Sequence, residues 1–206
     1  MIDTPKETRE EDRLNEKVIS DFVRSQGIAA TGALTIRQFR GGASNLTYQL
    51  DYDNLSYILR TSPKGTKAKG AHDMGREYNI MQKLKPVYPY VPQMIAFCKD
   101  ESLIGREFYI MEKLTGIIPR ANLPKDLQLN STQVRELCIS VIDKLIELHQ
   151  VDIHTTGLSE LGKGTGYCKR QIDGWTERYK KAKTWNVPWG CYGMDGRQTD
   201  VGTAGS

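Results

Sequence analysis

The chain has 206 residues, of which 38% are hydrophobic and 26% charged, and its formal net charge is +4. These values exclude a disordered or fibrous chain and are typical of one soluble domain or two small lobes. The slight basic excess suits small anionic ligands but is too weak to indicate nucleic-acid binding. We therefore expect no nucleic-acid partner. No apolar run is long enough to cross a bilayer, so we expect no membrane partner either.

The N-terminal residues and the cysteines predict a cytoplasmic protein. The opening sequence MIDTPKETREEDR has acidic residues where a signal peptide has its apolar segment. The four cysteines lie far apart and form neither a C-x-x-C pair nor a zinc-binding cluster with histidine. We therefore expect reduced thiols and a location inside the cell.

The first half of the chain predicts an antiparallel sheet that carries one helix. Leu14, Val18 and Phe22 recur every four residues, which predicts a first helix over residues 10–26. Helical spacing of apolar residues returns over 72–85. Alternating apolar and polar residues predict five strands, at 33–39, 46–52, 56–61, 93–99 and 106–112.

The character of the chain changes after Gly116. Amphipathic helices are predicted at 132–149 and 167–181, and a glycine-rich tail without periodicity follows. We therefore predict an α+β, protein-kinase-like arrangement: a five-stranded antiparallel N-lobe with one helix, followed by an incomplete helical C-lobe whose apolar helix faces are exposed. The expected parts are an N-terminal helical segment, the N-lobe, the start of the C-lobe and the tail, at 1–30, 31–116, 117–184 and 185–206.

A run of small residues separates the first two predicted strands. Such residues allow backbone N–H groups to approach a phosphate closely. An ordinary hairpin turn uses the same residue types, so this run by itself leaves both interpretations open. The residues are Gly41, Gly42, Ala43, Ser44 and Asn45.

Three later features could complete a phosphate site. Arg60 ends the third predicted strand and could reach under the glycine loop, and Glu77 on the next helix could pair with it. The backbone near Glu112 to Leu114 could offer a donor and an acceptor to the edge of an adenine ring. Each residue also has an ordinary structural explanation, but their order along the chain is that of protein kinases.

The chain resembles the aminoglycoside phosphotransferase-like, kinase-like family over about residues 33–183. The stretches that carry the resemblance include FRGGASNLTY, YILRTSP, GREYNIM, REFYIMEKLTG and LIELHQVD. The branch that it resembles is the one associated with acyl-CoA dehydrogenase domains. Only the N-terminal portion of the family pattern is matched, and the pattern stops near Thr184.

This resemblance implies a two-lobed fold that binds ATP and Mg²⁺ and transfers a phosphoryl group to a hydroxyl of a small molecule. For this branch it implies a hydroxyacyl acceptor rather than an antibiotic. Gly41 to Asn45 would cover the phosphates, and Arg60 would stand where kinases usually have lysine, with Glu77 as its partner. Met111, Glu112 and Leu114 would line the adenine site.

The catalytic loop of the family, H-G-D-x-x-x-x-N, is missing from the sequence. The three histidines are His72, His149 and His154, and none has aspartate two residues later. We therefore assign no catalytic residue and no metal ligand, and we predict a truncated, inactive form of the enzyme. The alternative is a non-catalytic nucleotide-binding or interaction module, fused to or partnered with an acyl-CoA dehydrogenase.

Overall fold

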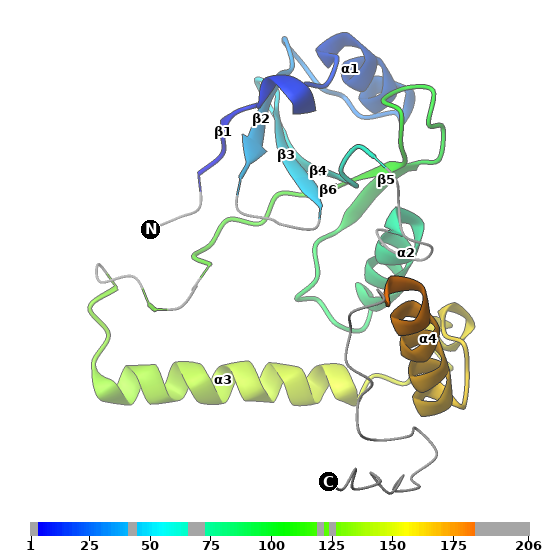
Figure 1. Ribbon diagram of the computed structural model, residues 1–206. Coiled ribbons are helices and arrows are strands. Elements are labelled where there is room, and N and C mark those ends of the chain that lie inside the picture. Colours follow the sequence, from blue (N-terminus) through cyan, green and yellow to red (C-terminus); the bar gives the residue numbers. More distant parts are fainter. Residues whose placement is uncertain (1–3, 41–44, 66–72, 119–121, 124–126, 184–206) are drawn as a thin grey trace, which may run out of the picture. The chain divides into compact units, whose positions relative to one another are not determined.

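The computed structural model describes residues 4–40, 45–65, 73–118, 122–123 and 127–183 (Figure 1). The chain divides into two compact units, Met1–Gly162 and Lys163–Ser206, which are described separately. Among the described residues, no helix has both the length and the apolar character needed to cross a membrane.

The first unit contains a six-stranded antiparallel sheet in the order β1-β2-β3-β4-β6-β5. The predicted α+β arrangement is confirmed, but the predicted count of five strands is wrong by one. The additional strand, β1, has only two residues, too few to produce an alternating pattern in the sequence. The strands are β1 (Lys6–Glu7), β2 (Thr35–Phe39), β3 (Leu46–Asp51), β4 (Ser56–Thr61), β5 (Met94–Cys98) and β6 (Phe108–Glu112).

The register of the strands places two rows of side chains on one face of the sheet. Directly paired residues of antiparallel strands project to the same side. One row is Arg37, Gln49, Ile58 and Met111, and the other is Phe39, Thr47, Arg60 and Tyr109. Arg60 therefore lies on the same face as the residues that flank the glycine loop.

The opposite face is covered by α1 (Glu16–Ser25), which packs on the largest apolar cluster of the protein. Ile19 and Val23 of this helix are fully buried, and Phe22 meets Phe108 edge to face with ring centroids 5.0 Å apart. The helix begins later than predicted, because the side chain of Asn15 accepts a hydrogen bond from the Val18 amide and caps it there. A short 3₁₀ turn, η1 (Glu10–Asp12), precedes it.

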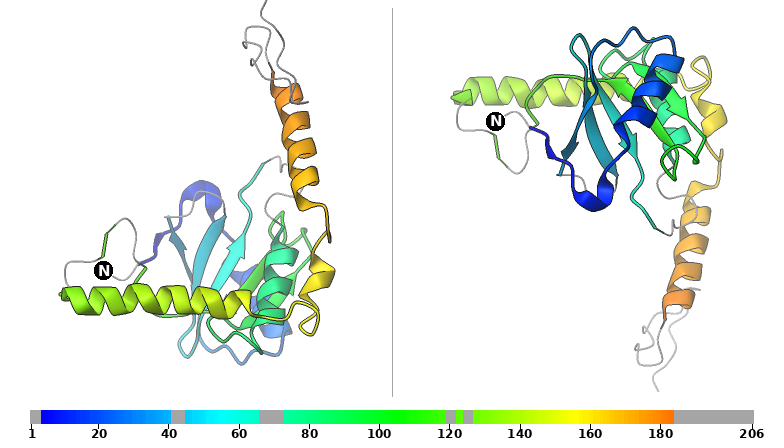
Figure 2. Two further views of the ribbon diagram at one scale, coloured as in Figure 1. Left: turned by 90° about the horizontal axis from the view of Figure 1, so that it is seen from below. Right: turned by 90° about the horizontal axis from the view of Figure 1, so that it is seen from above.

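The second helix, α2 (Met74–Leu84), lies on the face that carries the two rows, at its β5–β6 end. Asp73 caps it by accepting a hydrogen bond from the Arg76 amide, 2.8 Å away. Its buried Met74 packs with Met94 and Tyr109, and the views in Figures 1 and 2 show α1 and α2 on opposite sides of the sheet. Because α2 covers only one end of its face, the β2–β4 part of that face is left for a cavity.

The last helix of the first unit, α3 (Ser131–His149), is held at its start by a capping box between Asn130 and Gln133. None of its residues is buried, which confirms the expectation that its apolar face is exposed. The 3₁₀ turn η3 (Leu158–Leu161) follows, and Lys83 of α2 donates hydrogen bonds to Gly157 O and to Glu160 near it. In the second unit, α4 (Tyr167–Ala182) confirms the other predicted helix, with Arg178 stacked over Trp175.

Candidate functional site

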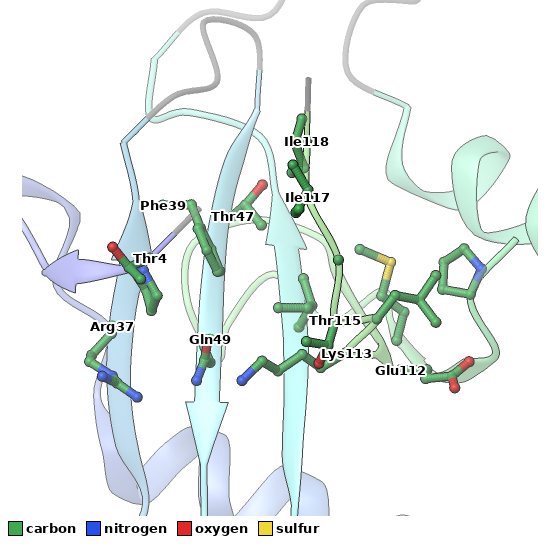
Figure 3. A pocket seen from close by; sticks show the side chains of 16 residues that line it. Thr4, Arg37, Phe39, Thr47, Gln49, Glu112, Lys113, Thr115, Ile117 and Ile118 are labelled. Carbon is green, nitrogen blue, oxygen red and sulfur yellow. The ribbon is translucent and has the colours of Figure 1, made fainter. Parts of the chain in front are cut away.

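A cavity of about 680 Å³ lies against the sheet face that carries the two rows. Strand residues Phe39, Thr47, Gln49 and Ile58 line it from one side. The last two residues of β6 and the segment that follows it, together residues 111–118, line it from another side, as Figure 3 shows. A cavity of this volume, lined by apolar side chains and a few polar groups, has the size and character of a small-ligand site.

The structure brings Arg60 and Glu77 together, although neither side chain lines the cavity. Nε of Arg60 lies 3.4 Å from Oε2 of Glu77, and both side chains are about one-third exposed. Arg60 is the neighbour of Thr47 in its row, and Thr47 lines the cavity. Arg60 therefore lies on the sheet face that the cavity covers, beside one of its lining residues, while the ion pair itself lies outside the lining.

Two further side chains hold the carboxylate of Glu77. The hydroxyl of Tyr109 donates to Oε2 at 2.9 Å, and the side-chain amide of Asn45 donates to Oε1 at 3.0 Å. Tyr109 is fully buried, and its burial and the adjacent carboxylate both raise the pKa of its hydroxyl. The phenol therefore stays protonated and remains a donor to Glu77.

Within the described part of the chain, the terminal nitrogens of Arg60 have no hydrogen-bond partner. Its Nε is the atom nearest to Glu77 in the ion pair, and no hydrogen bond between described residues uses Nη1 or Nη2. A guanidinium presents its donors in a planar fork that matches the oxygens of a phosphate group. Arg60 can therefore hold its charge against Glu77 and still donate to an anion.

The end of β6 and the segment after it contain the other predicted site residues. Met111, Glu112 and Leu114 all line the cavity. The carboxylate of Glu112 accepts a hydrogen bond from the Gln93 amide at 3.0 Å, and the Glu112 amide donates to Gln93 O at 2.9 Å. No hydrogen bond between described residues uses the backbone of Leu114, so the polar groups open to a ligand lie beyond the end of the strand.

Most of the glycine loop lies outside the described residues. Gly41, Gly42, Ala43 and Ser44 belong to this part of the chain, and their prediction stays a prediction. Asn45, the last residue of the loop, is described, and its bond to Glu77 connects the loop to α2.

Sequence reasoning missed several residues of this site. Tyr109 lies two positions before Met111 on one strand, and Ile58 lies two positions before Arg60 on another. Residues two apart on a strand face the same side, so this spacing could have indicated that both belong to the site. Arg37 also lines the cavity, where its Nη2 lies 2.7 Å from Oδ2 of Asp51. Burial acts to raise the pKa of Asp51, but hydrogen bonds from Ser56, Arg37 and Gln49 outweigh it and hold the pKa below its usual value.

The described residues offer no ligand set for Mg²⁺. They contain no group of three or more histidine, cysteine, aspartate or glutamate side chains that could hold a metal ion. Near the cavity, the carboxylate of Glu77 is bound by Asn45, Tyr109 and Arg60, and that of Glu112 by Gln93 and by Lys85 at 3.7 Å. Both carboxylates are already neutralised or hydrogen-bonded, so neither fits the role of a free metal ligand.

The profile of the family described as "Phosphotransferase enzyme family" matches residues 35–189. The chain belongs to this family. Its match begins at the first residue of β2 and includes the whole cavity-facing part of the sheet from β2 onward. The predicted family resemblance is thereby confirmed for this phosphotransferase domain.

Solved and curated relatives support the same assignment. A crystal structure of a protein from Ralstonia eutropha JMP134, assigned as an aminoglycoside phosphotransferase, superposes with a TM-score of 0.63 at 31% identity. The superposition covers 85% of this chain and 50% of that one, and the predicted kinase-like fold class is confirmed. The phosphotransferase domain is also 36% identical to "Acyl-CoA dehydrogenase family member 11" of Rattus norvegicus and 34% identical to family member 10 of Mus musculus.

These matches cover most of this chain but little of the curated relatives. The match to the rat protein includes 84% of the chain and 22% of the relative, and that to the mouse protein 79% and 15%. The chain therefore spans about a fifth of the length of the curated relatives that it matches.

Proposed function

We propose that the cavity on the β2–β4 face binds ATP and that this chain is the nucleotide-binding portion of a phosphotransferase acting on a small-molecule hydroxyl. The observation that carries the proposal is the Arg60–Glu77 pair, held by Tyr109 and Asn45, on the sheet face of an apolar cavity and beside its lining residue Thr47. A cation beside an apolar cavity suits a ligand that has a flat base at one end and phosphates at the other.

The adenine ring would lie between the sheet and the segment after β6. Ile58 and Met111, neighbours in one row, offer an apolar surface to one face of the ring. The backbone of Lys113 and Leu114, which forms no hydrogen bond between described residues, offers a donor and an acceptor to its edge. The phosphates would then extend toward Arg60 and the predicted glycine loop.

Phosphoryl transfer needs more than a bound nucleotide. Its rate comes from positioning the acceptor and from neutralising charge on the transferred group, which in kinases is the work of a catalytic-loop aspartate and bound magnesium. The sequence has no H-x-D motif, and the described residues have no metal-binding cluster. We therefore expect this chain by itself to bind ATP without turning it over.

The acceptor and the partner follow from the relatives. Their names support an acyl group in the acceptor and an acyl-CoA dehydrogenase domain in the same polypeptide or complex, and the hydroxyl of the acceptor is what a phosphotransferase of this kind would require. We also propose that the N-lobe ends and the C-lobe begins at residue 116. This boundary is supported by residues 114–118, which line the cavity where the chain leaves the sheet. The cytoplasmic location also stays a prediction.

The test is calorimetric titration of the purified chain with ATP, and with adenosine as a ligand that lacks phosphates. Arg60→Met should weaken ATP binding about tenfold or more, because charge-assisted hydrogen bonds to phosphate are lost, and should leave adenosine binding nearly unchanged. The matched control is Arg76→Met, which removes the same charge from an exposed position on α2 next to Glu77. Equal ATP affinity for the wild type and Arg60→Met would contradict the proposal.

A second titration addresses catalysis and the alternative function. With Mg²⁺ present, we expect no gain in ATP affinity from protein ligands and no release of ADP in a coupled assay with hydroxyacyl compounds. Turnover would contradict the predicted inactivity. Absence of ATP and adenosine binding would instead favour an interaction module, which the exposed apolar face of α3 also suits.

A further inference from the structure

The N-terminal segment reaches the cavity from outside the region matched by the family. The family match begins at residue 35, whereas Thr4 and Pro5 line the same cavity as Phe39 and Met111. Figure 3 shows Thr4 beside β2, close to Phe39 and Arg37 and across the cavity from Ile117. The cavity therefore has a wall that lies outside the residues matched by the family profile.

Backbone pairing and side chains hold this wall in place. β1 pairs antiparallel with β2, with Lys6 opposite Gln38 and Glu7 opposite Arg37. Just beyond the strand, the hydroxyl of Thr8 donates to Ile36 O at 3.3 Å. Arg40, at the start of the glycine loop, donates from Nη2 to Glu7 O at 2.7 Å, so the segment is also attached to the loop.

A buried polar cluster anchors the segment a few residues later. Gln38, which is 2% exposed, donates to Oδ2 of Asp12 at 2.9 Å and accepts from the Arg9 amide at 3.1 Å. The buried hydroxyl of Tyr48 donates to Asp12 O, also at 2.9 Å. Burial raises the pKa of Tyr48 to about 12, with the nearby Arg106 cation acting against it, so this donor is protonated at neutral pH.

These contacts make the position of Thr4 and Pro5 a property of the folded sheet. The buried side-chain amide of Gln38 bonds to both Asp12 and Arg9, and these two bonds fix the segment on the α1 face. β1 then carries the chain around the edge of the sheet. A two-residue strand alone would be too short to hold itself there. The anchor on one face therefore positions the wall of a cavity on the other.

We propose that residues 4–5 are part of the nucleotide site and contact the sugar of the bound nucleotide. This inference rests on the proposed function. With the base against Ile58 and the segment after β6, the sugar and phosphates must extend toward β2 and β3, where the glycine loop connects these strands. Thr4 offers a hydroxyl to the ribose hydroxyl groups, and Pro5 offers an apolar surface that excludes water.

The experiment compares ADP and ATP titrations of the wild-type chain with those of a variant lacking residues 1–5, which keeps β1. We expect affinity for both nucleotides to fall about fivefold, equivalent to about 1 kcal/mol, with an unchanged thermal midpoint. The matched control is Glu11→Gln, at an exposed position of the same segment whose side chain neither lines the cavity nor makes the contacts that hold residues 4–5, and it should bind both nucleotides as the wild type does. Hydrogen exchange should also show slower exchange at residues 6–7 when ADP is added.

The outcomes separate this inference from the function on which it rests. If the wild type binds ADP and ATP and the shortened chain binds both about fivefold more weakly, the proposed contact of residues 4–5 with the nucleotide is supported. If both chains bind the nucleotides with equal affinity, residues 4–5 do not contact the nucleotide, and the proposed nucleotide site itself is unaffected. If the wild type binds neither ADP nor ATP, the proposed function fails, and the wall fails with it.

Discussion

Replacing Tyr109 by phenylalanine tests whether Glu77 is held as the structure indicates. The substitution removes the hydroxyl that donates to Oε2 of Glu77 at 2.9 Å and leaves the buried ring in place. Phenylalanine has no hydroxyl that could be left without a partner. The free-energy cost of the substitution is therefore that of losing one hydrogen bond to a carboxylate. The hydrogen bond from Asn45 and the ion pair with Arg60 remain.

The size of the effect follows from how exposed the acceptor is. A hydrogen bond to a charged group is worth about 1.5–3 kcal/mol when buried. The Glu77 side chain is 35% exposed, so water competes for its oxygens. We therefore expect Tyr109→Phe to lower the free energy of unfolding by about 1 kcal/mol, after discounting for solvent screening.

The assay is urea unfolding followed by circular dichroism, with Tyr57→Phe as the matched control. Tyr57 lies on β4 with its side chain packed against the α1-side cluster, and no hydrogen bond between described residues uses its hydroxyl. The control should change the free energy of unfolding by less than about 0.5 kcal/mol. Equal losses in the two variants would refute the role given to the Tyr109 hydroxyl.

The pH dependence gives a second readout of the same contact. Because the pKa of Tyr109 is raised in the folded protein, the unfolded chain releases this proton first as pH rises above about 10. The stabilisation is complete below that pH and is lost as pH increases toward the folded pKa. Tyr109→Phe should therefore lose stability less steeply than the wild type above pH 10.

Three further predictions address other parts of the protein. Asp51→Asn should flatten the loss of stability in acid, because the lowered pKa of Asp51 stabilises the fold above about pH 4 and this contribution is lost as pH falls; acid titration followed by fluorescence measures it. Gly157→Ala should lower the free energy of unfolding by about 1 kcal/mol in urea, since φ is +68°, a left-handed conformation that strains a residue with a Cβ. The double variant Val141→Glu and Leu145→Glu, at positions 60% and 45% exposed on α3, should reduce self-association in sedimentation velocity without loss of helix content, and an unchanged sedimentation profile would contradict this.

The sequence predicted the local elements well, since each depends on spacing along the chain. The strands from 35 to 61 and the helix at Met74–Leu84 follow from alternation and from three-to-four-residue spacing. The order of glycine loop, Arg60 and Glu77 was also readable, because it needs only the sequence of the elements. Their meeting at 3.4 Å agrees with that order.

The rest of the site required the tertiary structure. Tyr109 became a partner of Glu77 only through the register of β4 with β6, which places Tyr109 beside Arg60 and under α2. Thr4 had no signal at all, because the strand that follows it is too short to show a period and the segment is held by contacts with residues 26 or more positions away. Spacing within a segment determines which face each side chain occupies, but only the pairing of distant segments decides which faces meet.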